Sequence, residues 1–317
     1  MEHKITHFLH VPWTGLGLYN GFRGNRWLKN RIQVFKQFVI PSLLAQENKN
    51  FILWCAFRRE EKNNPLVKEL QEYMDLITEF KTVFTFAGIC FWDDKYPNDV
   101  ARERLLTSLH GSMGELLNVM GEADTILMTI QPSDDCYHKN AVKALQELFE
   151  KMPDIQALGF TKGYICNYKT KEVKEYNPKT NPPFYTIKFP REAFIDPLKH
   201  AQYTSIKKDC GKYEAGTPIP SHEYVEYALK YGKIDERGFL VGVHGENIST
   251  HIDNPFAGDV VSQEVLKDFG IYDVEPIKIK YSVRKRILRS LPHGVQRKLR
   301  YWFGELVWQK MYNFLRS

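Results

Sequence analysis

The stretch TILMTIQPSDDCYHKN, residues 125–140, decides the fold that we expect. Its first six residues are typical of a strand buried on both faces, and Pro132 ends that strand. The residues from 137 to 151 have helical spacing. In open α/β sheets, ligands bind beyond the carboxyl ends of the strands. Asp134 and Asp135 therefore stand where a ligand-binding loop is expected.

The rest of the first 160 residues repeats this alternation of apolar runs and helical patterns. We expect strands at residues 5–11, 51–57, 82–92 and 125–130, and helices at residues 27–45, 65–80, 99–119 and 137–151. Pro41 should end or kink the first helix. Strands separated by helices of this length predict an α/β fold, with a mostly parallel sheet flanked by helices on both faces.

The pattern changes after about residue 157. Residues 163–176 resemble a hairpin, and residues 177–190 are rich in turn residues. Residues 221–231 have a helical pattern with Ser221 as a plausible N-cap, and residues 239–243 form a short strand. We expect one main domain over residues 1–260 and a basic, amphipathic helical extension over residues 261–317.

The composition is that of a folded globular chain of 317 residues, with 43% hydrophobic and 26% charged residues. Its five cysteines are widely spaced and include no CxxC pair, which is typical of reduced thiols in the cytoplasm. The first residues lack the apolar core of a signal peptide. No apolar run approaches the roughly 18 residues that a membrane span needs. These features favour a cytoplasmic location.

The net charge of +6 is concentrated at the C-terminal end. Residues 278–317 contain eleven Lys and Arg and one acid, whereas the rest of the chain has 33 basic and 37 acidic residues. Basic residues mixed with Trp and Phe predict a peripheral contact with an anionic membrane surface. The alternative is that these aromatics pack on the main domain. The slightly acidic body and the lack of a recognised motif argue against a nucleic-acid partner.

The adjacent acids of the loop indicate cation chemistry. Two neighbouring carboxylates are costly to bring together unless a cation or hydrogen bonds compensate them. A divalent ion held there would neutralise the negative charge that builds on a departing phosphate group. Asp134 is the candidate direct ligand, and Asp135 would support the ion or contact the substrate. The simpler alternative is that Asp134 caps the next helix and Asp135 is solvated.

A segment near the N-terminus adds a family resemblance. Residues 27–54, WLKNRIQVFKQFVIPSLLAQENKNFILW, resemble a bacterial rhamnosyltransferase family of GT-A glycosyltransferases. The matching residues are Arg31, Phe35, Pro41, Ser42, Leu43, Gln46, Phe51 and Trp54. HGEN at residues 244–247 is similar to the family's HG-x-N segment. The resemblance covers about residues 5–250 and is densest before residue 60.

The resemblance implies a GT-A fold and a glycosyltransferase that uses Mn²⁺ or Mg²⁺. Such an enzyme would move a hexosyl or deoxyhexosyl group, with rhamnosyl as one candidate, from a nucleotide-sugar donor to a glycan or lipid-linked acceptor. Family members usually have Asp-x-Asp-Asp in the acidic loop, but here Pro132 replaces the first Asp and Ile130 stands where Arg is common. The alternative is therefore a non-catalytic member that binds nucleotides or carbohydrates.

The same family resemblance implies further site residues. His244 is a candidate ligand of the metal or the diphosphate, with His251 as a second choice, because imidazole suits manganese and phosphate. Alternatively, His244 has a structural role as a hydrogen-bonded histidine at a strand end. Glu223 is the candidate general base, with His222 and Glu226 as the other choices. The alternative role of Glu223 is to complement a helix dipole.

Contacts with the nucleotide are expected from the region before residue 125. Arg102 and Arg104 could bind the diphosphate, since guanidinium groups suit phosphate oxygens. Asp94, beside Asp93, could meet the imide group of the base. The alternatives are a solvated helix face for the two arginines and a surface turn for the two acids.

Overall fold

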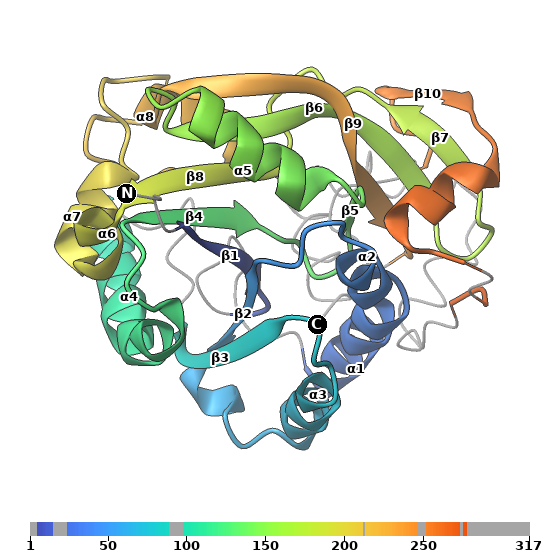
Figure 1. The fold of residues 1–317 in the computed structure, drawn as a ribbon, viewed down its shortest axis with the longest axis horizontal. Coiled ribbons are helices and arrows are strands. Elements are labelled where there is room, and N and C mark those ends of the chain that lie inside the picture. Colours follow the sequence, from blue (N-terminus) through green and yellow to red (C-terminus); the bar gives the residue numbers. More distant parts are fainter. Residues whose placement is uncertain are drawn as a thin grey trace, which may run out of the picture.

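Four parallel strands form the centre of the structure, a computed structural model that describes residues 5–14, 24–88, 98–211, 213–245, 252–272 and 275–277. They lie in the order β4-β1-β2-β3 (Figure 1). Their bounds are β1 Ile5–Pro12, β2 Ile52–Arg58, β3 Lys81–Gly88 and β4 Thr125–Ile130. The order places the carboxyl ends of β1 and β4 next to each other. The predicted α/β fold with a parallel core is confirmed.

The sheet continues beyond β4 through mostly antiparallel pairs, in the order β8-β6-β7-β10. A further long strand, β9, runs parallel to β6 and also pairs with the short β5. The bounds are β5 Cys136–Tyr137, β6 Ala157–Asn167, β7 Val173–Tyr176, β8 Tyr185–Pro190, β9 Tyr231–Val243 and β10 Ala257–Val260. The hairpin expected at residues 163–176 is confirmed as β6 and β7.

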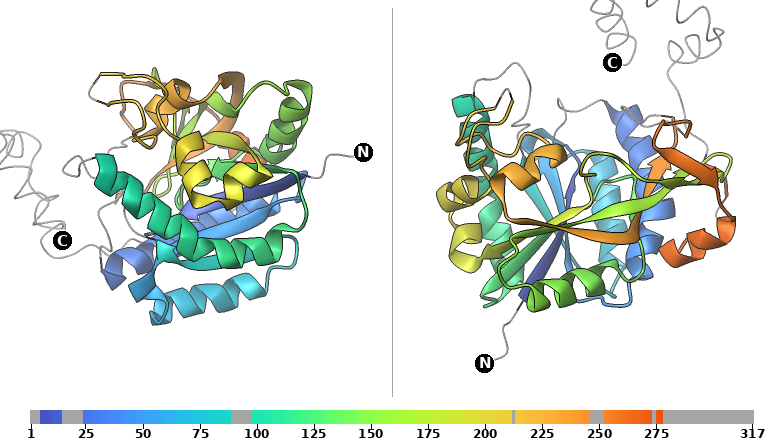
Figure 2. Two further views of the ribbon diagram at one scale, coloured as in Figure 1. Left: turned by 90° about the vertical axis from the view of Figure 1, so that its left-hand side faces the viewer. Right: turned by 90° about the horizontal axis from the view of Figure 1, so that it is seen from above.

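Helices cover the parallel strands on two sides (Figures 1 and 2). One side carries α1 Asn25–Val34, α2 Ile40–Leu44 and α3 Pro65–Asp75. The other side carries α4 Asn98–Met120, α6 Arg191–Ile195 and α7 Pro197–Tyr203, while α5 Ala141–Lys151 lies against the antiparallel strands. Short 3-10 turns lie at Arg59–Glu61, His222–Tyr224 and Gln263–Phe269, and α8 spans Val225–Ala228.

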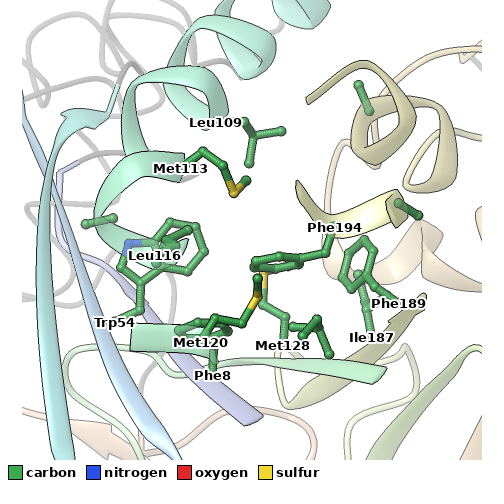
Figure 3. Packing of buried hydrophobic residues seen from close by; sticks show 14 of the residues in the cluster. Phe8, Trp54, Leu109, Met113, Leu116, Met120, Met128, Ile187, Phe189 and Phe194 are labelled. Atoms are coloured by element: carbon green, nitrogen blue, oxygen red, sulfur yellow. The ribbon is translucent and has the colours of Figure 1, made fainter. Parts of the chain in front are cut away.

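Successive side chains of β1 point to opposite faces of the sheet, so this strand packs against both layers of helices. Leu9 and Val11 point toward the layer of α1 and α3. Phe8 points the other way, into a cluster with Trp54 of β2 and with residues of α4 and α6 (Figure 3). Its ring stacks on Phe194 of α6, with ring centroids 5.5 Å apart. A strand buried on both faces needs apolar side chains on both, and Phe8, Leu9 and Val11 provide them, whereas His7 and His10 are buried polar residues of the same strand.

The first long helix does not end at Pro41, although its hydrogen-bond pattern changes just before the proline. A π-helical turn at Phe35–Val39 separates α1 from α2, and Pro41 lies in the first turn of α2. Proline has no amide hydrogen to donate to the preceding turn, but this loss is tolerated where a helix begins. The segment therefore changes its hydrogen-bond pattern just before the proline and then continues to Leu44.

The helix predicted over residues 221–231 is confirmed only in part. Residues His222–Tyr224 form a 3-10 turn and Val225–Ala228 form the short helix α8. The Ser221 side chain makes no cap hydrogen bond. The backbone becomes extended at Leu229, and from Tyr231 onward it pairs with β6.

Residues 261–277 pack against the main body, so far as they are described. Leu266, Phe269, Ile271 and Ile277 are buried in one cluster with Phe38 and Tyr168. The basic residues 278–317 lie outside the described part of the chain, so the helical extension and its membrane contact stay predictions. Within the described residues, each helix is too short or too polar to traverse a lipid bilayer.

Candidate functional site

The acidic loop connects β4 to β5 and is folded around Gln131. The backbone amide of Gln131 donates to the carbonyl oxygen of His10 at 2.8 Å, which joins the loop to the end of β1. The Gln131 side-chain amide donates to the backbone carbonyls of Pro132 and Asp135, both at 2.8 Å. These bonds fix the turn that carries Asp134 and Asp135.

Asp134 is held between two cationic or potentially cationic groups. Its Oδ2 pairs with the guanidinium of Arg31, from α1, and with Nε2 of His244 at 3.1 Å. Burial alone would raise the pKa of Asp134, but the nearby Arg31 and His244 outweigh burial and lower this pKa to about 2. These partners favour the ionised form of Asp134. The His244–Asp134 hydrogen bond corresponds to the alternative role of His244, a hydrogen-bonded histidine at a strand end, and its contact with a metal or diphosphate stays a prediction.

Asp135 has the opposite electrostatic environment. Its side chain is buried, and Oδ1 accepts a hydrogen bond from the backbone amide of Gly242 at 2.8 Å. Burial, and then the negative charge of Asp134, raises the pKa of Asp135 well above its usual value. The two neighbouring acids therefore differ in charge preference, and a bound cation would favour the ionised form of Asp135 as well.

The loop is pressed against β9 so closely that only glycine fits at residue 242. A Cβ atom there would lie 2.3 Å from the carbonyl oxygen of Asp134 and 2.3 Å from the ring of Tyr168. That tyrosine donates from its hydroxyl to the same Asp134 carbonyl at 3.0 Å. Its ring stacks on Phe38, with centroids 3.7 Å apart. The acidic loop is therefore fixed from behind by the C-terminal half of the fold.

The glutamine of the PSL-x-x-Q segment holds the other end of the loop. Gln46 is fully buried at the end of α2. Its Nε2 donates to the carbonyl of His138 at 2.9 Å, and its Oε1 accepts from the amide of Val142 at 3.1 Å. This motif residue thus positions the chain between the acids and α5 rather than contacting a ligand.

A cavity of about 500 Å³ opens beside the acidic loop. Its lining brings together Asp134, Asp135 and Arg31 with Glu223 and His222. Asp134, Asp135 and the predicted base Glu223 thus face one space at the carboxyl ends of β1 and β4, where an α/β fold is expected to bind a ligand. His244, the other predicted metal ligand, does not line this cavity, and the roles of all four residues stay predictions. Glu226, an alternative base, is exposed elsewhere, with its carboxylate 4.0 Å from the Lys233 ammonium.

Sequence reasoning missed Arg31 as a site residue, although it noted Arg31 as a family match. The signal was present, because Arg31 lies three residues after Leu28 and four before Phe35, on the buried face of its helix. A charged residue in such a position needs a partner. Sequence reasoning also missed the turn-rich segment of residues 177–190. This segment lines the cavity through Pro178, Thr180, Pro182 and Pro183.

The predicted nucleotide contacts are not brought into this cavity. Arg102 and Arg104 lie on α4 but are not among the lining residues, and the same helix contributes Leu105 and Leu109 instead. Leu105 and Leu109 are one helical turn apart and face the sheet, where an apolar contact is required. Asp94 and His251 fall outside the described residues, and their predicted roles stay predictions.

A divalent cation fits this site only together with a phosphate-bearing substrate. Across the described residues, no group of three or more His, Cys, Asp or Glu could enclose a metal. Asp134 is also engaged by Arg31 and His244. Mg²⁺, however, commonly binds through one or two carboxylates and completes its shell with water and substrate phosphates. Asp134 and Asp135, which both line the cavity, meet that lesser requirement.

Comparison with known proteins yields distant structural likenesses. No family model matches the chain, and no curated protein matches it. S. aureus TarS is similar with a TM-score of 0.35 and 10% identity, over 76% of this chain and 37% of TarS. A protein described as a putative nucleotide-diphospho-sugar transferase from Desulfovibrio desulfuricans G20 gives a TM-score of 0.32 and 11% identity, over 75% and 80% of the two chains.

The chain thus spans little more than a third of the length of TarS.

Proposed function

We propose that this protein is a GT-A-type glycosyltransferase that moves a sugar from a nucleotide donor to a hydroxyl group of a glycan or lipid-linked acceptor. The observation that carries the proposal is the convergence of Asp134, Arg31 and Glu223 on one cavity. Transfer from a nucleoside diphosphate needs a group that manages phosphate charge and a base near the acceptor hydroxyl. The resemblance to a rhamnosyltransferase family supports a hexosyl or deoxyhexosyl donor.

Arg31 and the acidic pair would manage the charge of the leaving diphosphate. The Arg31 guanidinium is preoriented by its ion pair with Asp134 and has further N–H groups to donate to phosphate oxygens. Asp134 and Asp135 would hold Mn²⁺ or Mg²⁺, and His244 would fix Asp134 from behind. When bound, that ion would supply Lewis-acid stabilisation of the departing phosphate.

Glu223 would accept the proton of the acceptor hydroxyl. Its side chain is exposed to the cavity from the 3-10 turn His222–Tyr224. His222 lines the same space, but its Nδ1 is engaged by the carbonyl of Asn181, and burial lowers the pKa of His222. Glu223 is therefore the better placed of the two candidates to receive a proton from a mobile substrate.

The test is turnover of a panel of nucleotide sugars with Mn²⁺ or Mg²⁺, alone and with simple glycoside acceptors. Asp134→Ala should abolish release of the nucleoside diphosphate, and Glu223→Gln should reduce transfer to the acceptor by about 10²- to 10⁴-fold. Chelation of the divalent ion should stop turnover in the wild-type protein. Full activity of Asp134→Ala would remove the proposed centre.

The alternative is a non-catalytic protein that binds a nucleotide or carbohydrate. Pro132, where the family usually has an acid, favours it. Tight binding of a nucleotide sugar without release of the diphosphate, for every donor and acceptor tried, would establish this alternative.

A lipid-linked acceptor would be supported by binding of the full chain to anionic vesicles and loss of that binding after removal of residues 278–317.

A further inference from the structure

His10 is a polar residue in a position where the fold needs an apolar one. It lies on β1, directly between Trp54 of β2 and Ile130 of β4 in the strand register. The imidazole is only 4% exposed and lies over the Trp54 ring, with ring centroids 4.1 Å apart. Neither ring nitrogen has a hydrogen-bond partner in the described part of the chain.

A second histidine of the same strand shows what a structural imidazole looks like here. His7 is equally buried, but its Nε2 hydrogen-bonds Thr129 Oγ1 at 2.7 Å and its Nδ1 hydrogen-bonds Gln146 Nε2 at 3.1 Å. Buried polar groups without partners are unfavourable and rare. Since His10 lacks such partners, its nitrogens are better explained by a ligand than by the fold.

His10 also faces the cavity of the acidic loop. The lining of that cavity includes His10 together with Trp54, Leu109, Met128, Ile187 and His200, and we call these six residues the His10 chamber. Figure 3 shows four of these side chains, Trp54, Leu109, Met128 and Ile187, in the apolar cluster that packs between α4 and the sheet. The chamber is thus apolar on most sides and polar at the two imidazoles.

The imidazoles of the chamber are uncharged. Burial, with a further contribution from His200, lowers the pKa of His10 to about 3. Burial lowers the pKa of His200 to about 4. A neutral imidazole offers one N–H donor and one nitrogen acceptor. Such a chamber cannot compensate the negative charge of a carboxylate or a phosphate. Burial of such a charge without a partner is very unfavourable.

We propose that the His10 chamber is a recognition subsite for an uncharged part of the sugar substrate, in which a hydroxyl or amide lies next to a methyl group. His10 would hydrogen-bond the polar atoms, and Trp54, Leu109 and Met128 would pack against the methyl group. Deoxyhexoses and N-acetylated amino sugars have this chemistry, whereas uronic acids do not. This inference rests on the proposed glycosyltransferase function and adds a specificity-determining residue to it.

The test uses His10→Phe, which keeps the ring on Trp54 and removes both nitrogens, with His7→Phe as a matched control. Calorimetry would measure binding of UDP and dTDP, and of UDP-N-acetylglucosamine, dTDP-rhamnose and UDP-glucuronate. We expect His10→Phe to weaken the best neutral sugar nucleotide about tenfold, as loss of a hydrogen bond does, and to leave binding of the free nucleotide unchanged. Thermal unfolding should show that His10→Phe is at least as stable as wild type and that His7→Phe is less stable.

A second measurement needs no variant. In the wild-type chain labelled with ¹⁵N-histidine, the His10 imidazole nitrogens should shift when the neutral sugar nucleotide is added, but not with UDP or dTDP alone. Unchanged affinity in His10→Phe together with unshifted His10 nitrogens would overturn the subsite while leaving glycosyl transfer intact. Preferred binding of UDP-glucuronate would also overturn it. If wild type binds none of these nucleotides, the proposed function itself fails.

Discussion

Single residues set the charge balance of the cavity, and Arg31 is the clearest case. It is the buried partner of an ionised carboxylate, so removing it leaves Asp134 with less compensation. Arg31→Met should therefore destabilise the fold by about 3–5 kcal/mol and abolish turnover. Urea unfolding and donor turnover are the two measurements.

The double variant Arg31→Met with Asp134→Asn separates the two effects. With both charges removed, most of the lost stability should return, whereas turnover should stay absent. Equal stability of wild type and Arg31→Met would contradict the buried ion pair.

Residue patterns alone predicted part of this site. Asp134 and Asp135 could be singled out because two adjacent acids follow a buried strand, and Glu223 could be singled out from the family resemblance. His10 could not, because FLHVP reads as an ordinary buried strand until the strand neighbours Trp54 and Ile130 are known. Cross-strand neighbours depend on the register, which local sequence does not contain.

At the scale of elements, the contact between β9 and the acidic loop fixes the site. Gly242→Ala would place a Cβ atom within 2.3 Å of the Asp134 carbonyl and the Tyr168 ring, so the loop must shift. We expect a loss of about 1–3 kcal/mol in unfolding free energy and a large fall in turnover. Gly114→Ala, in α4 with open space around its Cβ, should instead stabilise the protein by about 0.5–1 kcal/mol.

If Gly242→Ala retained wild-type turnover, the acidic loop would not need its close contact with β9. A crystal structure of the variant would show whether the Asp134 carbonyl has moved away from Tyr168. The Gly114→Ala control excludes a general intolerance of alanine at glycine positions.

Whether a segment forms a helix or a strand was predictable wherever its apolar residues keep one spacing over a long stretch. The strands of the parallel sheet and α3 to α5 follow from apolar runs and helical spacing. The strand predicted at residues 239–243 begins at Tyr231 instead, because the backbone from there pairs with β6, more than sixty residues earlier. Such long-range pairing is decided by the whole fold and not by the local sequence.

For the whole molecule, buried neutral histidines determine how stability responds to acid. Burial lowers the pKa of His7 and of His10 to about 3, and that of His200 to about 4, from an ordinary value near 6.5. The unfolded chain binds protons at these sites below about pH 6.5, whereas the folded chain does not. The stability that these groups contribute is thus present above pH 6.5 and is lost as the pH falls toward 3–4.

Each such group should reduce the free energy of unfolding by up to about 1.4 kcal/mol per pH unit in that window. Urea unfolding at pH 7.0, 6.0, 5.0 and 4.5 measures the slope, and His10→Phe should make it shallower. A free energy of unfolding that stays constant between pH 7.0 and 4.5 would show that these imidazoles are protonated in the folded state.

The packing of residues 275–277 bears on how an acceptor could reach the protein. The amide of Ile277 donates to the carbonyl of Tyr168 at 3.2 Å, and the carbonyl of Glu275 accepts from Gln37 at 2.7 Å. The hydroxyl of that same Tyr168 holds the Asp134 backbone. Ile277 is therefore fixed directly behind the acidic loop. If residues 278–317 bind a membrane surface as predicted, glycans on that surface would be held at a high effective concentration near the site, so capture of an acceptor would depend on tether length more than on bulk supply.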